Sequence, residues 1–280
     1  MVTARDVERL LTRIQSIRRT PARQLQLETR MRRELATFFR EIGKDTAEYI
    51  QSLGRVPARD DPALHPLSEY FRRKTKEYQV ILGKYVFTAF LMGRERVSPK
   101  KKGQAHKAYQ WNPEFEDEYA ALWPVFDGLI EPNIAQLLID KFFTASERTM
   151  ARVEGDVMAN LAMSYMDGVG NYDAAMNLNE VMRDMALYET ERIARTEINS
   201  AQNYGAFLQL ESAGVTEVMW ITALDDRVRG LNPKDAADHV SMHGEVTRLG
   251  EPFSNGLLFP GDRDGPIEEW INCRCQIVTV

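Results

Sequence analysis

The chain has 280 residues, of which 44% are hydrophobic and 28% charged, and its formal net charge is −5. This composition is typical of a folded protein with one large domain or two moderate ones, at roughly 100–200 residues each. Its mild acidity excludes a wholly basic nucleic-acid-binding protein, and two cysteines are too few for a disulfide framework. No run reaches the roughly 18 apolar residues of a membrane helix, and no secretory apolar segment follows Met1. We therefore expect a protein of a reducing cytoplasm with no membrane partner.

The first three quarters of the chain show the apolar spacing of helices, with hydrophobic residues three or four positions apart. Gly54 and Pro57 are stop signals after the first strong pattern, and Gly214 follows the last one. Helices are predicted over 23–53, 67–92, 113–125, 131–153, 155–167 and 173–212.

Basic residues are concentrated near the start, where residues 1–40 hold ten Arg against four acidic residues, a net charge of +6. Arg5, Arg9 and Arg13 recur at four-residue spacing, and Lys100, Lys101 and Lys102 form a second basic stretch. These side chains are candidates for contact with phosphate, where affinity is electrostatic and independent of sequence. Contact with an acidic partner and a merely solvated helix face are the alternatives that the pattern leaves open.

After Gly214 the chain becomes rich in glycine and proline, and short alternating segments replace the helical spacing. Strands are predicted over 215–222, 245–248, 257–259 and 276–280. We expect an α+β fold. A mainly α-helical region, 1–172, Arg-rich at its start, precedes a small loop-rich α+β domain, 173–280, that begins with a long helix and holds the short strands.

The loop-rich part holds both cysteines, Cys273 and Cys275, and two of the four histidines, His239 and His243. If the histidine segment is helical, a spacing of four places both imidazoles on one face, and two Cys with two His form a common zinc set. The C-x-C spacing is shorter than structural zinc sites usually show. Two other interpretations stay open: the cysteines alternate on a final strand with one packed inward, or one is a nucleophile beside a histidine.

Five segments occur in a fixed order: "ARTEINSAQNYG", "WITALDDRVR", "HVSMHG", "LLFPGDRDGP" and "NCRC". Their order and spacing closely resemble the phage head morphogenesis domain of the phage Mu F-like minor head proteins and the SPP1-type minor capsid protein. The resemblance covers about residues 190–280. The positions that match the family's motifs, besides His243 and the two cysteines, are Arg195, Thr196, Glu197, Asn203, Gly205, Trp220, Asp226, Arg227, Arg229, Gly244, Phe259, Pro260, Gly261, Asp262 and Asn272.

The sequence departs from the family where some members carry further metal-binding residue types. Cys pairs after the Asp-Arg turn and a His before the terminal cysteines are replaced here by Val228, Arg229 and Trp270. Metal binding, which has been suggested for the family from its Cys and His residues, is therefore less strongly indicated in this chain.

The resemblance implies a non-enzymatic, structural protein of a tailed double-stranded DNA phage or prophage, which acts in procapsid assembly together with the portal. Its implied partners are the portal protein, capsid or scaffold proteins and, as an open alternative, double-stranded DNA. Its implied location is the virion, in the head interior or near the portal, and the host cytoplasm during assembly. Two other functions stay open: a metal- or thiol-dependent virion enzyme that uses the His/Cys cluster, and a non-specific DNA-binding protein.

Overall fold

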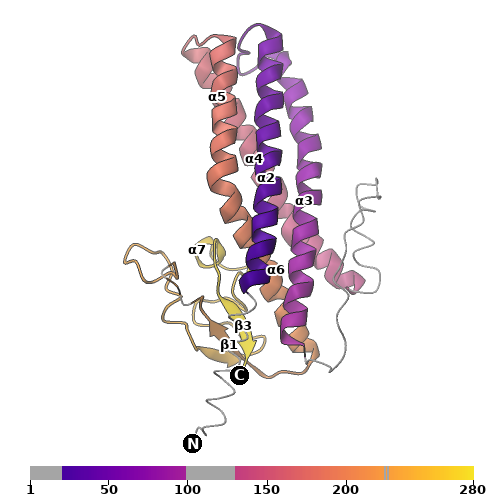
Figure 1. Ribbon diagram of the computed structural model, residues 1–280, viewed down its shortest axis with the longest axis vertical. Coiled ribbons are helices and arrows are strands. Elements are labelled where there is room, and N and C mark those ends of the chain that lie inside the picture. The colour runs from indigo at the N-terminus through magenta and orange to yellow at the C-terminus, as the bar shows by residue number, and fades with distance from the viewer. Residues whose placement is uncertain (1–20, 99–129, 224, 226) are drawn as a thin grey trace, which may run out of the picture.

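Two long helices form an antiparallel hairpin at the start of the structure, a computed structural model that describes residues 21–98, 130–223, 225 and 227–280 (Figure 1). Helix α2 spans Pro21–Leu53 and helix α3 spans His65–Val97, with a 3-10 turn, η1 (Pro62–Leu64), between them. The three-to-four spacing of apolar residues places one stripe of each helix in the core, which confirms the helices predicted over 23–53 and 67–92. The segments 1–20 and 99–129, which contain the basic residues at 5, 9, 13 and 100–102 and the helix predicted over 113–125, lie outside the described residues.

The third long helix, α4, runs without interruption over Pro132–Met166, where two helices were predicted. The prediction of a break near residue 154 was wrong because Val153, Val157 and Leu161 continue one buried stripe across it. Gly155 lies on the exposed side of that stripe, where a glycine lowers helix propensity but removes no packing.

The chain then forms one helical run that passes from one end of the molecule to the other (Figure 1). It comprises α5 (Asn171–Asp184), a π-helical turn, η3 (Met185–Glu189), and α6 (Thr190–Ser212). This confirms the long helix predicted over 173–212 and adds the π turn. All residues from Thr196 to Phe207 are buried. A helix buried around its whole circumference needs neighbours on every side, and α6 packs against α2, α3 and the C-terminal strand.

Helices α3 and α6 approach each other closely at two glycines. A Cβ added to Gly93 would lie 1.9 Å from the carbonyl oxygen of Gln202, and one added to Gly205 would lie 2.1 Å from that of Phe90. The two backbones are therefore in contact, and neither position has room for a larger residue. Since α2 and α3 pack directly on α5 and α6, the helices of the two predicted regions share one core. The division between 172 and 173 stays a prediction.

The C-terminal part adds a small antiparallel sheet beside the lower end of α6 (Figure 1). Its strand order is β2 (Val246–Arg248), β1 (Glu217–Ile221), β3 (Gln276–Thr279), with Trp220 opposite Ile277. Three predicted strands are thus confirmed, and the overall α+β class with them. The strand predicted over 257–259 was wrong: this segment forms turns, in which Phe253 N–H donates to Leu257 O at 2.9 Å. A four-residue helix, α7 (Ile267–Trp270), precedes β3.

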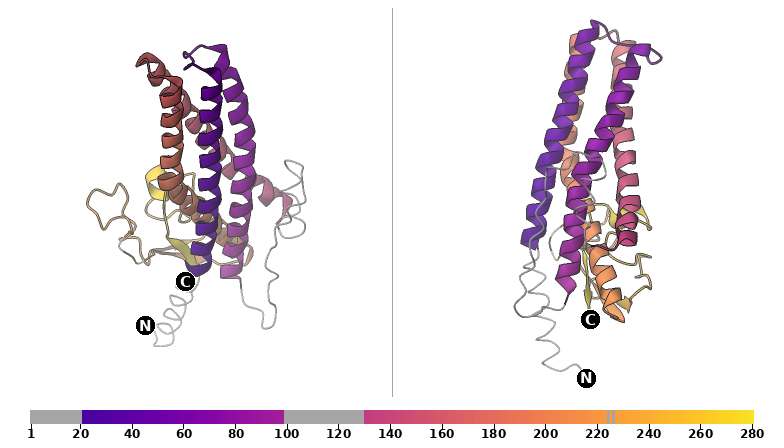
Figure 2. Two further views of the ribbon diagram at one scale, coloured as in Figure 1. Left: turned by 45° about the horizontal axis from the view of Figure 1, so that its top comes forward. Right: turned by 90° about the vertical axis from the view of Figure 1, so that its right-hand side faces the viewer.

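Loops in the C-terminal part lie to one side of the bundle, while the α2–α3 and α4–α5 connections meet at its opposite end (Figures 1 and 2). Within the ranges that the structure describes, none of the helices is both long and apolar enough to cross a membrane.

The contact between α3 and α6 leads to a stability prediction. Gly205→Ala is expected to lower the free energy of unfolding by about 1–3 kcal/mol, because a new Cβ would force two helix backbones apart. The matched control is Gly155→Ala, also in a helix interior, where an added Cβ meets nothing within 4 Å. It is expected to raise stability by up to about 1 kcal/mol. Urea denaturation measures both, and equal effects of the two variants would contradict the proposed close approach.

Candidate metal centre

Helix α6 holds the start of the terminal "NCRC" segment through the first residues of its motif. Arg195 Nη1 donates to Asn272 Oδ1 at 2.8 Å, and Asn272 N–H donates to Thr196 Oγ1 at 2.8 Å. Asn272 has φ 55°, a left-handed conformation that asparagine tolerates better than most residues. The chain therefore turns sharply at Asn272 just before the first cysteine.

Asn203 fixes the end of the same segment. Its side chain is fully buried, and its amide donates from Nδ2 to Cys275 O at 2.9 Å while Oδ1 accepts from Ile277 N–H at 3.1 Å. The amide thus makes the two hydrogen bonds that a neighbouring strand would otherwise make with these backbone groups at the start of β3. Arg96 Nη2, from α3, donates to the same Oδ1 at 3.1 Å.

The Pro-Gly-Asp loop also packs on α6. Ser200 Oγ donates to Gly261 O at 2.5 Å, and Glu197 forms an ion pair with Arg263, whose guanidinium lies 5.2 Å from the centre of the Trp270 ring. Gly261 has φ 87°, and a Cβ there would approach Ser200 Cα to 2.9 Å. Phe259 and Asp262, two further buried members of this motif, flank the contact, and Phe259 stacks on Tyr204 with ring centres 5.5 Å apart.

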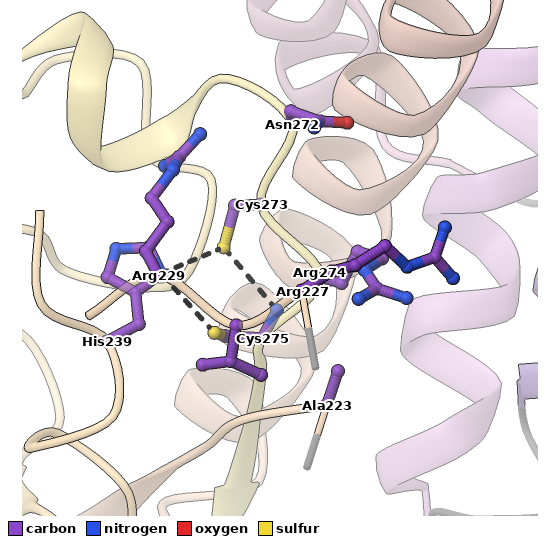
Figure 3. A pocket seen from close by; sticks show the side chains of 9 residues that line it. Ala223, Arg227, Arg229, His239, Asn272, Cys273, Arg274 and Cys275 are labelled. Atoms are coloured by element: carbon purple, nitrogen blue, oxygen red, sulfur yellow. Dashed lines mark hydrogen bonds between the residues drawn. The ribbon is translucent and has the colours of Figure 1, made fainter. Parts of the chain in front are cut away.

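These contacts bring both cysteines to one histidine (Figure 3). His239 Nδ1 lies 3.5 Å from Cys275 Sγ and 3.8 Å from Cys273 Sγ, and the three atoms all lie within 4.8 Å of one another. Each of the three residues is at most 3% exposed. The expectation that the cysteines alternate on a final strand, with one packed inward, was wrong. Strand β3 begins only at Gln276, and the turn at Asn272 directs both sulfurs inward.

The separations fit a tetrahedral zinc ion. Bond lengths of about 2.0–2.1 Å to nitrogen and 2.3 Å to sulfur require the nitrogen and each sulfur to lie about 3.6 Å apart. The observed distances of 3.5 and 3.8 Å are close to that value. Cys275 N–H also donates to Cys273 Sγ at 3.4 Å, which favours the thiolate form that a metal binds. His239, Cys273 and Cys275 are therefore the residues that would hold the ion.

Glu269 and Asn255 orient the histidine from its other side. His239 Nε2 lies 3.0 Å from Glu269 Oε2, which also accepts from Asn255 Nδ2 at 2.9 Å. A carboxylate in this position keeps the proton on Nε2 and turns the Nδ1 lone pair toward the sulfurs, as the outer partners of metal-binding histidines do. Sequence reasoning missed both residues. One available signal was that Glu269 precedes Cys273 by only four residues.

The three buried groups alter one another's protonation. The hydrogen bond from Cys275, followed by contact with His239, holds the pKa of Cys273 well below its usual range. The same hydrogen bond and burial raise the pKa of Cys275. Burial lowers the pKa of His239, but the hydrogen bond and charge of Cys273, aided by Glu269, more than offset it, so the net pKa is raised. Cys273 is thus already disposed to be a thiolate, the ligand form.

His243 lies apart from this cluster. The histidine segment forms turns rather than a helix, so the two imidazoles do not share a face. His243 Nδ1 accepts from Thr222 N–H at 3.3 Å and lies 3.1 Å from Thr222 Oγ1. Gly244 follows with φ 86°, and its N–H donates to Trp220 O at 2.8 Å, so the His-Gly motif joins the histidine loop to β1.

The remaining motif residues surround the cluster. Trp220 is fully buried with its ring centre 5.3 Å from that of His239. Arg229 Nη1 donates to Glu268 O at 2.5 Å, and Arg227 is exposed nearby. Pro260 is buried in the Pro-Gly-Asp loop, and Asp226 lies outside the described residues.

A small pocket beside the cluster has a volume of about 10 Å³, close to the space that one water needs. Both thiols are buried, and both cysteines line this space. A nucleophilic cysteine must reach its substrate, and a site of this size suits an ion and a very small ligand better than thiol catalysis.

Comparison with protein families now identifies this part of the molecule. Residues 155–278 match the model of the family described as phage Mu protein F like protein. Over these residues the chain is similar to the phage Mu F-like proteins. The resemblance stated from the motifs is thereby confirmed, and this similarity suggests a role in phage head morphogenesis, of the kind that minor capsid proteins have. Comparison with curated proteins and with solved structures found no match.

Measurements of unfolding can test whether the Asn203 amide holds β3 in this Mu F-like region. Asn203→Ala is expected to lower the free energy of unfolding by roughly 2–4 kcal/mol, because Cys275 O and Ile277 N–H lose their buried partner. Asn177→Ala, at an exposed position on α5, is the matched control and should change stability by less than about 0.5 kcal/mol. Chemical denaturation provides the comparison. A loss below that limit in Asn203→Ala would mean that the amide does not hold β3.

Proposed function

We propose that this protein is a minor head protein of a tailed double-stranded DNA phage or prophage, acting in procapsid assembly in association with the portal. It works without catalysis, in the virion at the head interior or near the portal. The observation that carries this proposal is the use of the family motif in the fold. Arg195, Thr196 and Asn203 bind the terminal segment to the bundle instead of lining an open cleft.

The end of the bundle far from the sheet supports a role in protein assembly. Large apolar side chains are at least half exposed on both sides of the α4–α5 connection: Met163, Tyr165, Met166, Tyr172 and Met176. We call these five residues the bundle tip. Exposed apolar patches of this kind mark protein contacts, and methionine adapts its shape to a partner. We propose that the portal protein covers the bundle tip.

This proposal predicts co-purification with portal or procapsid particles. Met166→Glu, at a residue that is 81% exposed, is expected to abolish the association without loss of folding. Leu231→Glu, also exposed but in the C-terminal loops, is the control and should associate normally. Sedimentation of particles from co-expressing cells measures the bound fraction. Absence of the unchanged protein from both portal and procapsid fractions would refute the assembly role.

We also propose that one Zn²⁺ held by His239, Cys273 and Cys275 cross-links the histidine loop to the terminal segment. The ion would have a structural role, because its binding free energy adds to the free energy of unfolding. The purified protein should contain about one equivalent of zinc, and chelation should lower its melting temperature. His239→Ala should lose the metal, whereas His243→Ala, the matched control, should keep it. Metal content below about a tenth of an equivalent in the unchanged protein would end this proposal.

Contact with packaged DNA rests on the charge of residues 1–40 and on Lys100, Lys101 and Lys102. A contact of this kind releases counterions, so the affinity for duplex DNA should fall steeply as salt rises. Filter binding or fluorescence anisotropy at several salt concentrations tests it. Binding that does not change with salt would exclude contact through phosphates.

A further inference from the structure

The cluster supplies fewer ligands than a tetrahedral zinc ion requires. His239, Cys273 and Cys275 form a complete group among the described residues, and no fourth His, Cys, Asp or Glu within those ranges joins them. His243, the fourth ligand expected from the sequence, uses its Nδ1 at Thr222. Glu269 lies beyond the other nitrogen of His239. A bound ion would therefore have one position that these side chains do not fill.

The small pocket adjoins this position. Its wall includes all three ligand residues, and its volume of about 10 Å³ is close to the space that one water needs. Figure 3 shows the two sulfurs and the imidazole facing one another, with arginine side chains around them. A centre with three protein ligands and one open position is the arrangement of zinc ions that exchange a ligand.

The charges around the pocket favour an anion there. Two thiolates neutralise the charge of Zn²⁺, so the ion itself does not require another negative ligand. The pocket wall, however, contains Arg227, Arg229 and Arg274. Arg274 pairs with Asp225, and Arg229 donates to a neutral carbonyl of Glu268. Arg227 is exposed, and its charge also acts on Glu191. Among the described residues that line the pocket, positive charge thus exceeds negative charge, which lowers the free energy of a bound anion.

We propose that this centre keeps an exchangeable fourth coordination position, which faces the arginine-lined pocket and takes water or a small monodentate anion. The inference rests on the proposed zinc site. In the exchange, the water leaves, one bond forms between the metal and the anion, and no electron is transferred. The size of the pocket limits the ligand to one donor atom with a small substituent.

Cobalt substitution tests the open position directly. The full-length protein is stripped of metal, loaded with Co²⁺ and titrated with azide and then with acetate, while the ligand-field bands and the cobalt content are recorded. A saturable change of the bands at constant cobalt content is expected, because a new donor atom enters the coordination sphere. Arg227→Gln should weaken azide binding about two- to fivefold, the effect of losing one exposed charge, without changing the cobalt content. Arg248→Gln, an exposed arginine on β2 away from the pocket wall, is the control and should bind azide normally.

The outcomes separate the two proposals. Cobalt bound at one equivalent, with bands that excess azide and acetate leave unchanged, would mean that the protein itself fills the fourth position, so this inference would fail while the zinc site stands. Loss of cobalt on adding azide would also count against an open position. Failure of the unchanged protein to bind either cobalt or zinc would overturn both proposals.

Discussion

The contact of Asn203 with the backbone of the terminal segment is the interaction on which the C-terminal part depends. A buried amide that donates to Cys275 O and accepts from Ile277 N–H fixes the position and direction of β3 relative to α6. Neither backbone group could stay unpaired in a dry interior without a cost of about 1–3 kcal/mol. Helix α6 therefore pairs these backbone groups as a neighbouring strand would. The other two strands of the sheet lie beyond β3, on the side away from this contact.

The geometry of the cysteines follows from this constraint. With Cys275 O held by Asn203 and Asn272 held by Arg195 and Thr196, the short segment between them is fixed at both ends. The left-handed turn at Asn272 then directs both sulfurs toward His239. A C-x-C spacing is unusual for a metal when considered alone, but here both sulfurs lie within 3.8 Å of His239 Nδ1. Glu269 completes it by fixing the tautomer of the histidine.

Helix α6 connects this module to the rest of the bundle. It is buried on all sides because α3 approaches it at Gly93 and Gly205, while the terminal segment and the Pro-Gly-Asp loop cover its other face. A displacement of the C-terminal module would therefore disturb the bundle core, and the reverse also holds. Such a coupling lets one body present two distinct surfaces, the bundle tip and the loop-rich module.

The sequence by itself determined the elements whose signals are local. Apolar periodicity and stop residues located α2, α3 and the long run through α5 and α6, and alternation located the three strands. The order of five short motifs indicated the family that residues 155–278 resemble, and the concentration of Cys and His in one region indicated where a metal would bind. Predictions from periodicity were wrong at two places. The buried segment 257–259 is not a strand, and Gly155 interrupts the apolar pattern without ending a helix.

Only the tertiary structure decided which of these residues meet. His239, rather than His243, faces the cysteines because the loop that carries both is shaped by contacts with Trp220 and Thr222, not by a repeating backbone geometry. Glu269, Asn255 and Gly93 gain their roles from residues distant in the chain, and no spacing rule connects them. Local sequence specifies local dihedral angles, whereas a site assembled from loops depends on long-range packing, which the bundle and α6 provide.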